Sequence, residues 1–496
     1  MLNVEELRGR IAAELKRWEV PGCVLTLVKD GEVLYAGGVG SRDNAGSPVT
    51  GQTLVQIASC SKAFTATLAA VLATEGLLDF DTPVVNYMPD FRLADDYATS
   101  HLTVRDFLSH RSGLPRHEMA WYGSGFSRKE LLYNLRYLPL NAPIRYRFQY
   151  SNFNYLIVGS LIERLTGMRF EDAMREKLLR PLGMTDSYVY LDDIEARPDH
   201  CLAFDRPEEY TMTGIQQIPY YSSPAQKAAD ENGERVGDPT AAAGCIVSCA
   251  ADMAKWLQFN LDRGRVGETQ LVREDLMDLL QSIHIYMGED PDVQPEQIAN
   301  CYALGWFIYT YRGHKMVEHG GNLNGFSSSA CFFPDLDLGV FVSANMNVVL
   351  LPDAICRTVA DMVTESAGTD WFGRYHAANE RMFAHVLEYF RSMGGTPAEG
   401  TAPSHALADY AGTYEAPGYR RFRVDFENGG LKADFNTFAA GLKHYHYDTF
   451  ATDAPIGELP SGLPVTFGTD PSGRVCTLSV MLGSEQDLKP IVFTKA

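Results

Sequence analysis

The sequence lacks an apolar run long enough to cross a membrane. A span needs about 20 apolar residues, and one of the longest uncharged stretches, Leu338 to Pro352, is interrupted by Asn345 and Asn347. The amino terminus shows no basic head followed by an apolar core, so no secretory leader is visible. We therefore expect a cytoplasmic protein with no membrane partner.

Basic residues are scarce. The chain has 43 Lys and Arg against 63 Asp and Glu, which gives a formal net charge of −20 over 496 residues. A body this acidic repels phosphate backbones and anionic lipid, so we expect no nucleic-acid partner. The nine cysteines are an odd number and scattered, which is typical of reduced thiols rather than a disulfide framework.

Several catalytic and cofactor motifs are also missing. No G-x-S-x-G turn occurs, and neither a Walker loop nor a complete dinucleotide-binding glycine motif is present. His444 and His446 would share a strand face and could chelate a metal, but no third ligand is identifiable. We interpret this pair as part of the surface of a small carboxy-terminal barrel, described below, and expect neither a metal nor an organic cofactor.

The first 365 residues mix helix and strand signals. The apolar spacing predicts helices at Val4–Trp18, Ser59–Glu75, Asn154–Thr166 and Ala250–Leu261, and strands on both sides of Asp30-Gly31 and of Pro334-Asp335. Strands from both ends of a unit with helices between them indicate an α/β fold with a mixed, mainly antiparallel sheet and a helical region. The polar stretch from Asp205 to Pro239 is either a lid or a solvated surface loop.

A second unit follows a helix and a linker. A helix is predicted from about Trp371 to Met393, and a Gly/Pro/Thr/Ala/Ser-rich linker runs from Gly394 to His405. The remaining residues read as short strands separated by turns, which is typical of a small all-β barrel or sandwich. We expect domains at 1–365 and 406–496, with a helix and linker at 366–405.

The first candidate chemical motif is Ser59-Cys60-Ser61-Lys62. Residues three apart on a helix lie on one face, so the Lys62 amine can reach the Ser59 hydroxyl and activate it as a nucleophile. Taken alone, the motif is more often a capping serine with a solvated lysine than a catalytic pair. In this geometry Cys60 points away from Lys62, and we interpret it as structural.

Two further motifs offer partners for the serine. Tyr150-Ser151-Asn152 opens a helix, and its phenol can act as a base only if a cation such as Lys62 holds the phenolate. The Asn152 amide can orient both an amine and a substrate carbonyl. His319-Gly320-Gly321-Asn322 ends a predicted short strand, where glycines allow a substrate backbone to approach.

In this order, Ser59-x-x-Lys62, Tyr150-x-Asn152 and His319-x-Gly321 resemble the motifs of the serine β-lactamase and penicillin-binding-protein superfamily. The resemblance covers roughly residues 5 to 350. It includes connecting segments at Leu108–Leu114, Phe148–Asn152, Arg180–Met184 and Ala243–Ser248. Within the superfamily the chain is similar to the class C-related branch of D-aminopeptidases, carboxypeptidases and β-lactamase-like esterases. The last 90 or so residues resemble a lipocalin-like barrel, with Tyr410-Ala411-Gly412-Thr413-Tyr414 as its opening.

The resemblance implies a serine hydrolase that cleaves an amide or ester of a small molecule or short peptide, D-amino acid peptides included. Ser59 would be the nucleophile, Lys62 and Tyr150 would share the general-base task, and the N–H groups of Ser59 and Asn322 would form the oxyanion hole. Asn152 and His319 would orient the substrate beside Gly320 and Gly321. His319 stands where class C β-lactamases have the lysine of Lys-Thr-Gly, which argues against antibiotic hydrolysis. An acyltransferase and a non-catalytic, ligand-binding member are the alternatives.

The substrate itself is not encoded in these motifs. Tyr220 and Tyr221 of the polar stretch and the acidic loop Gly288–Glu296 are candidate pocket walls, and negative walls favour a cationic or neutral ligand. The sequence leaves the oligomeric state open, a homo-oligomer included.

Overall fold

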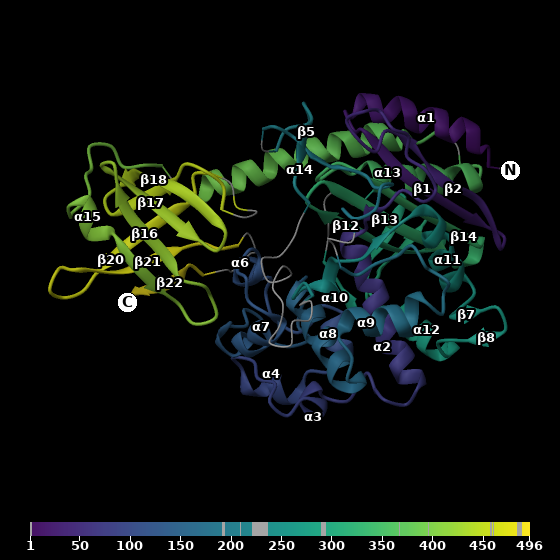
Figure 1. Cartoon of the computed structure of the whole chain (residues 1–496), viewed down its shortest axis with the longest axis horizontal. Helices are drawn as coiled ribbons and strands as arrows, with labels where there is room; N and C mark the ends of the chain where they lie inside the picture. Colours follow the sequence, from purple (N-terminus) through teal and green to yellow (C-terminus); the bar gives the residue numbers. More distant parts are fainter. Residues whose placement is uncertain are drawn as a thin grey trace.

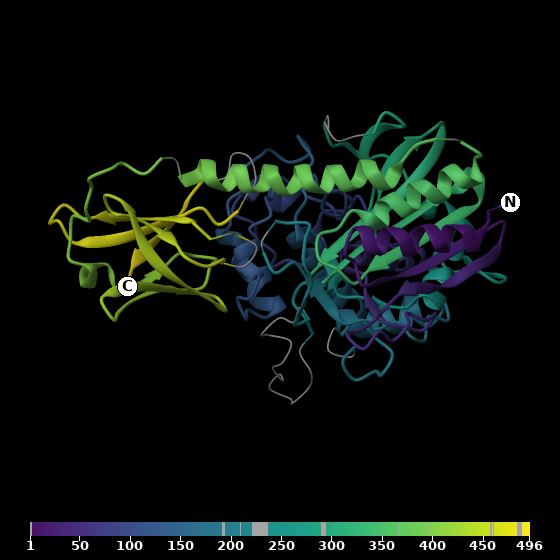
Figure 2. The same ribbon diagram turned by 90° about the horizontal axis from the view of Figure 1, so that it is seen from above.

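An eight-stranded sheet with helices on both faces is joined by one long helix to a separate barrel in the computed structural model (Figures 1 and 2). The structure describes residues 2–190, 194–208, 210–220, 237–288, 294–366, 368–394, 396–456, 459, 461–483 and 489–496.

The sheet has the strand order β2-β1-β14-β13-β12-β11-β10-β9, and every neighbouring pair is antiparallel. Its strands are β1 (Gly22–Lys29), β2 (Glu32–Gly40), β9 (Ile285–Tyr286), β10 (Gln297–Tyr302), β11 (Phe307–Tyr311), β12 (His314–Leu323), β13 (Phe326–Phe333) and β14 (Leu338–Ala344). The predicted hairpin at Asp30-Gly31 joins β1 to β2, and both residues have positive φ as a tight hairpin turn requires. Strands from both ends of this unit pair directly as β1 and β14, which confirms the expected fold class.

Two apolar cores lie on opposite faces of the sheet. Along β1, Cys23, Leu25 and Leu27 belong to one core, while Val24 and Val28 belong to the other. This alternation is the period-two pattern of a strand that is buried on both sides. The first core is covered by α1 (Val4–Arg17), α13 (Leu351–Val363) and the start of α14 (Trp371–Gly394).

The other face is covered by the helical region. Its helices are α2 (Ser61–Thr74), α3 (Val84–Tyr87), α4 (Asp96–His101), α5 (Val104–Leu108), α6 (Glu118–Trp121), α7 (Arg128–Asn134), α8 (Asn152–Thr166), α9 (Phe170–Met174), α10 (Ala241–Gly244), α11 (Ala250–Leu261) and α12 (Glu274–Leu280). Short strand pairs β3 (Val55–Gln56) with β6 (Val247–Ser248), β4 (Ala203–Asp205) with β5 (Gln216–Ile218), and β7 (Arg265–Val266) with β8 (Thr269–Gln270) connect them. From Ser61 to Ala73 every residue of α2 is buried, as expected for a central helix rich in Ala, Thr and Leu.

The carboxy-terminal part is a closed eight-stranded barrel. Its strands run in sequence order as β15 (Gly412–Glu415), β16 (Phe422–Glu427), β17 (Gly430–Phe435), β18 (Phe438–His446), β19 (Thr449–Thr452), β20 (Pro464–Thr469), β21 (Val475–Val480) and β22 (Ile491–Lys495), and β15 closes on β22. Inward-facing aromatic side chains fill it, among them Phe422, Phe435 and Phe493. A single helical turn, α15 (Leu407–Tyr410), precedes the first strand where strand alone was expected.

The barrel touches the helical region as well as following it in sequence. Figure 2 shows α14 running from the sheet unit to the barrel, and Figure 1 places α6 beside the barrel. A cleft of about 1090 Å³ lies where they meet and is lined from both sides, by Ser124 and Phe126 as well as Arg420 and Lys495.

The structure shows the state of the cysteines and allows a search for membrane-spanning helices. All nine cysteines are unpaired, and eight of them are buried. Within the described ranges, no helix is both long enough and apolar enough to traverse a bilayer.

Candidate active site

Ser59 stands at the junction between a short strand and the central helix. It lies in a 3₁₀ turn, Ala58–Cys60, that leads directly into α2. Ala58 has a φ of 49°, a left-handed conformation that costs a non-glycine residue about 1–3 kcal/mol. Such strain, held by fully buried neighbours, leaves Ser59 itself half-buried. The backbone thus presents the hydroxyl at the end of a buried helix.

Lys62 is the best-defined group of the site. Its Nζ lies 3.0 Å from Ser59 Oγ, 2.8 Å from Asn152 Oδ1 and 2.8 Å from the Ala243 carbonyl oxygen. The side chain has no exposed surface. Burial, with a contribution from Arg116, holds the pKa of Lys62 well below its usual value.

Tyr150 and Asn152 enter the site from the start of α8, as the sequence predicts. Ser151 is the N-cap residue, and Asn152 begins the helix. Lys62 Nζ lies 4.7 Å from the centre of the Tyr150 ring. Burial raises the pKa of Tyr150, and a hydrogen bond with Ser59 opposes this only in part. The resting phenol is therefore protonated, and burial opposes the phenolate that a role as base would require.

His110 contacts the ring of Tyr150 and the backbone on both sides of it. Its carbonyl oxygen accepts from the N–H of Gln149 at 2.7 Å, and its Nδ1 accepts from the N–H of Ser151 at 3.2 Å. The imidazole also packs on the Tyr150 ring, with 4.4 Å between ring centres. His110 is fully buried and has a φ of 55°. Both chain neighbours of Tyr150 and its ring are thus fixed by one strained residue.

Arg116 and Glu118 form a charged pair beside these residues. Glu118 Oε1 lies 2.8 Å from Arg116 Nη2 and accepts from Asn152 Nδ2 at 3.4 Å. The Arg116 guanidinium lies 5.5 Å from the centre of the Tyr150 ring. Sequence reasoning missed Arg116, Glu118 and His110 in these roles. A signal in the sequence existed for His110 alone, because the family resemblance singled out the segment Leu108–Leu114 without assigning it a function.

His319 lies within β12 and not at the end of a strand. The prediction was wrong here because Gly320 and Gly321 continue the ladder with β13 as far as Leu323. Its Nδ1 lies 2.5 Å from the Gly320 oxygen and its Nε2 3.0 Å from the Tyr302 hydroxyl. Burial, with a contribution from Lys62, lowers the pKa of His319 to about 3. The imidazole is therefore neutral, and its ring centre lies 6.3 Å from that of Tyr150.

The two glycines after His319 differ in their surroundings. A Cβ atom on Gly321 would lie 2.9 Å from the backbone nitrogen of Ser59 and 2.5 Å from the Ile57 oxygen, whereas one on Gly320 would meet nothing closer than 3.7 Å. Gly321 therefore allows β12 to approach the nucleophile. The Asn322 side-chain oxygen accepts hydrogen bonds from the Val348 N–H and the Ser327 hydroxyl. Its backbone N–H is therefore the group that we consider as an oxyanion donor.

Cys60 and the described part of the expected pocket walls have contacts of their own. The Cys60 thiol donates to the His319 carbonyl oxygen at 3.1 Å, and burial raises its pKa. Tyr220 bonds to the Cys201 carbonyl and stacks on Phe326, while Tyr221 lies outside the described residues. Of the acidic loop, Glu296 forms an ion pair with Arg374, and residues 289–293 lie outside the description.

The structure thus brings Ser59, Lys62, Tyr150 and Asn152 into one cluster from two distant stretches of chain. The His319 ring lies next to that of Tyr150, and Gly321 lies against the Ser59 nitrogen. Among the described residues, no group of three or more His, Cys, Asp or Glu side chains is arranged to hold a metal ion. The catalytic roles assigned to these residues stay predictions.

Known proteins are similar to this chain over most of its length. An unguisins hydrolase from Aspergillus campestris is 29% identical over 437 residues, which are 85% of this chain and 78% of the relative. A second unguisins hydrolase, from Aspergillus violaceofuscus, is 27% identical over 496 residues, 92% of this chain and 84% of the relative. Protein flp of Staphylococcus aureus is 25% identical over 350 residues, 70% of this chain and 64% of its own length.

Solved structures share the fold. The octameric penicillin-binding protein homologue from Pyrococcus abyssi superimposes with a TM-score of 0.59 at 21% identity, covering 100% of both chains. A structure named SurE gives a TM-score of 0.56 at 21% identity and covers 99% of both chains.

Two family models divide the chain between them. A domain of unknown function, DUF3471, matches residues 396–495, which contain the barrel. The Beta-lactamase model matches residues 7–364, which contain the sheet, the helical region and the whole serine–lysine–tyrosine cluster. With relatives that are named hydrolases, this family supports an activity of the serine-hydrolase type. The chain belongs to the Beta-lactamase family.

Proposed function

We propose that this protein cleaves an amide or ester bond of a small molecule or short peptide through an acyl-enzyme on Ser59. The observation that carries the proposal is the set of partners around Lys62 Nζ. A neutral amine has two N–H groups and one lone pair, and the oxygens of Asn152 and Ala243 can accept both hydrogens. The lone pair then faces Ser59 Oγ at 3.0 Å and can take its proton.

The surroundings of the amine support this protonation state. Burial lowers the pKa of Lys62 and so favours its uncharged form, in which the amine can act as the base without a phenolate. As the Ser59 oxygen attacks the carbonyl carbon, its proton passes to Lys62. Tyr150, a protonated phenol hydrogen-bonded to Ser59, donates its proton to the leaving group and is reprotonated from Lys62. Water then attacks the acyl-enzyme by the reverse route.

The carbonyl oxygen of the substrate would become an oxyanion between two backbone N–H groups. Those of Ser59 and Asn322 are the donors we assign, and the contact of Gly321 with the Ser59 nitrogen keeps the strand and the nucleophile close together. Preorganised donors of this kind contribute about 10²–10³ in turnover each.

The free edge of β12 supports a substrate with an extended, peptide-like backbone. Pairing of β12 with β11 ends at Glu318, whereas pairing with β13 continues to Leu323. One edge of residues 319–323 is therefore not covered by β11 and can pair with a chain laid along it. The names of the two unguisins hydrolases support hydrolysis rather than transfer to another acceptor. A buried lysine held between two acceptors beside a serine argues against a non-catalytic member.

The test is covalent labelling followed by turnover. A fluorophosphonate probe should label the wild type and a Cys60→Ala variant, and should fail to label Ser59→Ala. Labelling that persists in folded Ser59→Ala protein would show that the nucleophile is wrong. A panel of nitrocefin, short p-nitrophenyl esters and D-amino acid amides, with intact-mass detection of the acyl-enzyme, then identifies the bond. Adding an amine or alcohol acceptor distinguishes transfer from hydrolysis.

A further inference from the structure

The segment from Arg116 to Ser124 lies between the candidate active site and the barrel, with α6 at its centre (Figure 1). Its site-facing side carries the charged pair described above. Glu118 is 8% exposed and accepts from Asn152, and Arg116 lies beside the Tyr150 ring. Asn152 in turn accepts from Lys62. The position of α6 is therefore transmitted to the serine–lysine pair through two hydrogen bonds.

The opposite side of the same segment is seated on the barrel. Met119 is 1% exposed and packs within the barrel's own apolar core. Asn436, in the turn between β17 and β18, donates from Nδ2 to the carbonyl oxygens of Met119 at 2.9 Å and Tyr122 at 2.8 Å. A helix of four residues leaves such carbonyls without partners of its own. Asn436 thus fixes the end of α6.

Further contacts surround this seat. Phe438 stacks on Tyr122 with an interplanar angle of 2° and 5.7 Å between ring centres. The Tyr419 hydroxyl oxygen lies 2.8 Å from His117 Nδ1. Arg420 donates from Nε to the Ser124 carbonyl oxygen at 2.7 Å. Tyr419 and Arg420 belong to the β15–β16 connection, and Phe438 begins β18 directly after the β17–β18 turn, so one end of the barrel holds the segment.

The segment and the barrel turn are closely packed at Gly123. A Cβ atom on Gly123 would lie 2.5 Å from Thr437 Oγ1 and 3.0 Å from the Phe438 ring, and Gly123 also has a φ of 65°. A shift of the barrel turn toward Gly123 would therefore press directly on the segment.

We propose that the barrel is a positioning element of the active site, in which the turn Asn436–Phe438 fixes α6 and thereby orients Asn152 and Tyr150 through Glu118 and Arg116. The inference rests on the proposed function, since it concerns how fast Ser59 is acylated. Asn436 acts through other residues and is a positioning residue. Displacing a catalytic constellation by about 1 Å typically costs up to ~10²-fold in rate.

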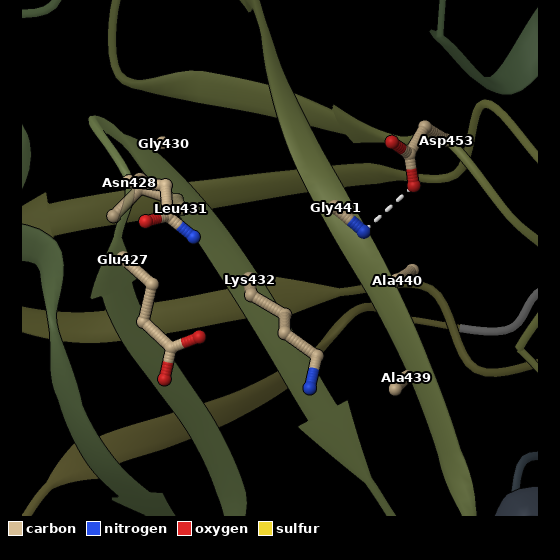
Figure 3. Close-up of a pocket in the computed structure, with 9 residues that line it drawn as sticks. All are labelled: Glu427, Asn428, Gly430, Leu431, Lys432, Ala439, Ala440, Gly441 and Asp453. Carbon is tan, nitrogen blue, oxygen red and sulfur yellow. Dashed lines mark hydrogen bonds between the residues drawn. The ribbon is translucent and has the colours of Figure 1, made fainter.

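The chain offers a matched control in the neighbouring hairpin. Asn428, in the turn between β16 and β17, has a φ of 53° and Asn436 a φ of 55°, so both are asparagines in left-handed turns of one barrel. Asn428 lines a pocket of about 300 Å³ with Lys432 and Asp453 on the outer face of the barrel (Figure 3). Glycine at either position keeps the turn conformation and removes only the side chain.

The experiment uses the full chain and the fluorophosphonate probe over a range of concentrations. For Asn436→Gly we expect the maximal rate constant of Ser59 labelling to fall about 10- to 100-fold. The half-saturating concentration should stay within about threefold, since the loss lies in orientation and not in binding. Asn428→Gly should match the wild type in both. Asn436→Asp, which keeps the shape but has no N–H to donate, should lose rate like Asn436→Gly.

Rates are expressed per folded molecule, from circular dichroism of each sample. If Asn436→Gly and Asn436→Asp label as fast as Asn428→Gly, or if their loss only follows the folded fraction, the inference is overturned. Should Asn436→Gly fail to fold, Phe438→Leu makes the same comparison and is expected to fall at least fivefold. A wild type that is not labelled at Ser59 overturns the proposed function and this inference together.

Discussion

At the residue scale, the two glycines after His319 have unequal surroundings and should differ in their tolerance of substitution. Gly321→Ala would place a methyl group 2.5 Å from the Ile57 oxygen and 2.9 Å from the Ser59 nitrogen, so β12 and the nucleophile must separate. We expect turnover, or the rate of probe labelling, to fall about 10²–10³-fold, as for the loss of one oxyanion donor. Gly320→Ala meets only an ordinary contact at 3.7 Å and should stay within a few-fold of the wild type. Equal activities in the two variants would contradict the assigned role of Gly321.

At this scale the sequence predicted the residues whose spacing is local. Ser59 and Lys62 are three apart, so helix geometry alone places them together. His110, the Ala243 carbonyl and Glu118 reach the cluster only through tertiary contacts, and nothing in their local spacing indicates those contacts. The sequence also could not show how the two basic candidates are tuned. Burial of both side chains, which a motif does not reveal, lowers the pKa of Lys62 and raises that of Tyr150.

At the element scale, β12 carries opposite chemistry on its two faces. His319 faces the site, while Glu318 faces α13 and is bound by Arg357 through Nη1 at 2.5 Å and Nη2 at 2.6 Å. Burial alone would raise the pKa of Glu318, but Arg357 outweighs it and lowers that pKa. Arg357 is 4% exposed, so this is a buried ion pair directly beneath the candidate site.

Breaking the pair from one side should therefore be costly. Arg357→Met would leave the Glu318 carboxylate buried without its cation, and we expect the free energy of unfolding to fall by about 3–5 kcal/mol. The double variant Glu318→Met/Arg357→Met removes both charges of this pair, leaves Asp353, 3.9 Å from Arg357 Nη1, without that cation, and should recover most of that loss. Chemical denaturation of the wild type, the two single variants Glu318→Met and Arg357→Met, and the double variant measures the interaction energy between the two side chains. Additive effects would mean that the pair contributes no interaction energy.

The buried imidazole on the other face gives β12 a pH-dependent stability. His319 titrates at about 3 when folded, against about 6.5 in an unfolded chain. Between these values only the unfolded chain binds the proton, so the free energy of unfolding falls as the pH drops below about 6.5. One such group contributes a slope of up to ~1.4 kcal/mol per pH unit.

The measurement compares His319→Asn with the wild type by chemical denaturation at pH 7 and pH 5. We expect the variant to lose less stability over this interval than the wild type. Part of the loss should remain, because burial also holds the pKa of His110 well below its usual value. Asp353 works in the opposite direction in both proteins, since burial raises its pKa. Identical losses in the two proteins would contradict a buried, neutral His319.

Most elements were predictable from apolar periodicity and turn residues. The Asp30-Gly31 and Asn428-Gly429 turns formed hairpins because both positions accept positive φ. The end of β12 was misplaced because glycines are read as turn signals, whereas here both continue the strand and Gly321 removes a side chain where β12 meets Ile57 and Ser59. The Asp205–Pro239 stretch gave no period, and the structure describes only part of it, including the β4–β5 hairpin.

At the scale of the whole molecule, the burial of the cysteines can be counted in solution. Eight of the nine thiols are buried and only Cys476 is partly exposed. We expect about one thiol per chain to react rapidly with a disulfide reagent in the native protein, and nine in denaturant. The fast thiol should disappear in Cys476→Ser. Several rapidly reacting thiols in the native state would show that the cores open far more readily than this packing implies.

The long helix between the two units has a consequence for how the barrel is kept in place. Because α14 and the short segment after it tether the barrel beside α6, undocking and redocking are intramolecular events. Short tethers commonly give effective concentrations in the millimolar range. A barrel supplied as a separate polypeptide at micromolar concentration would therefore compete poorly with the one attached to the same chain.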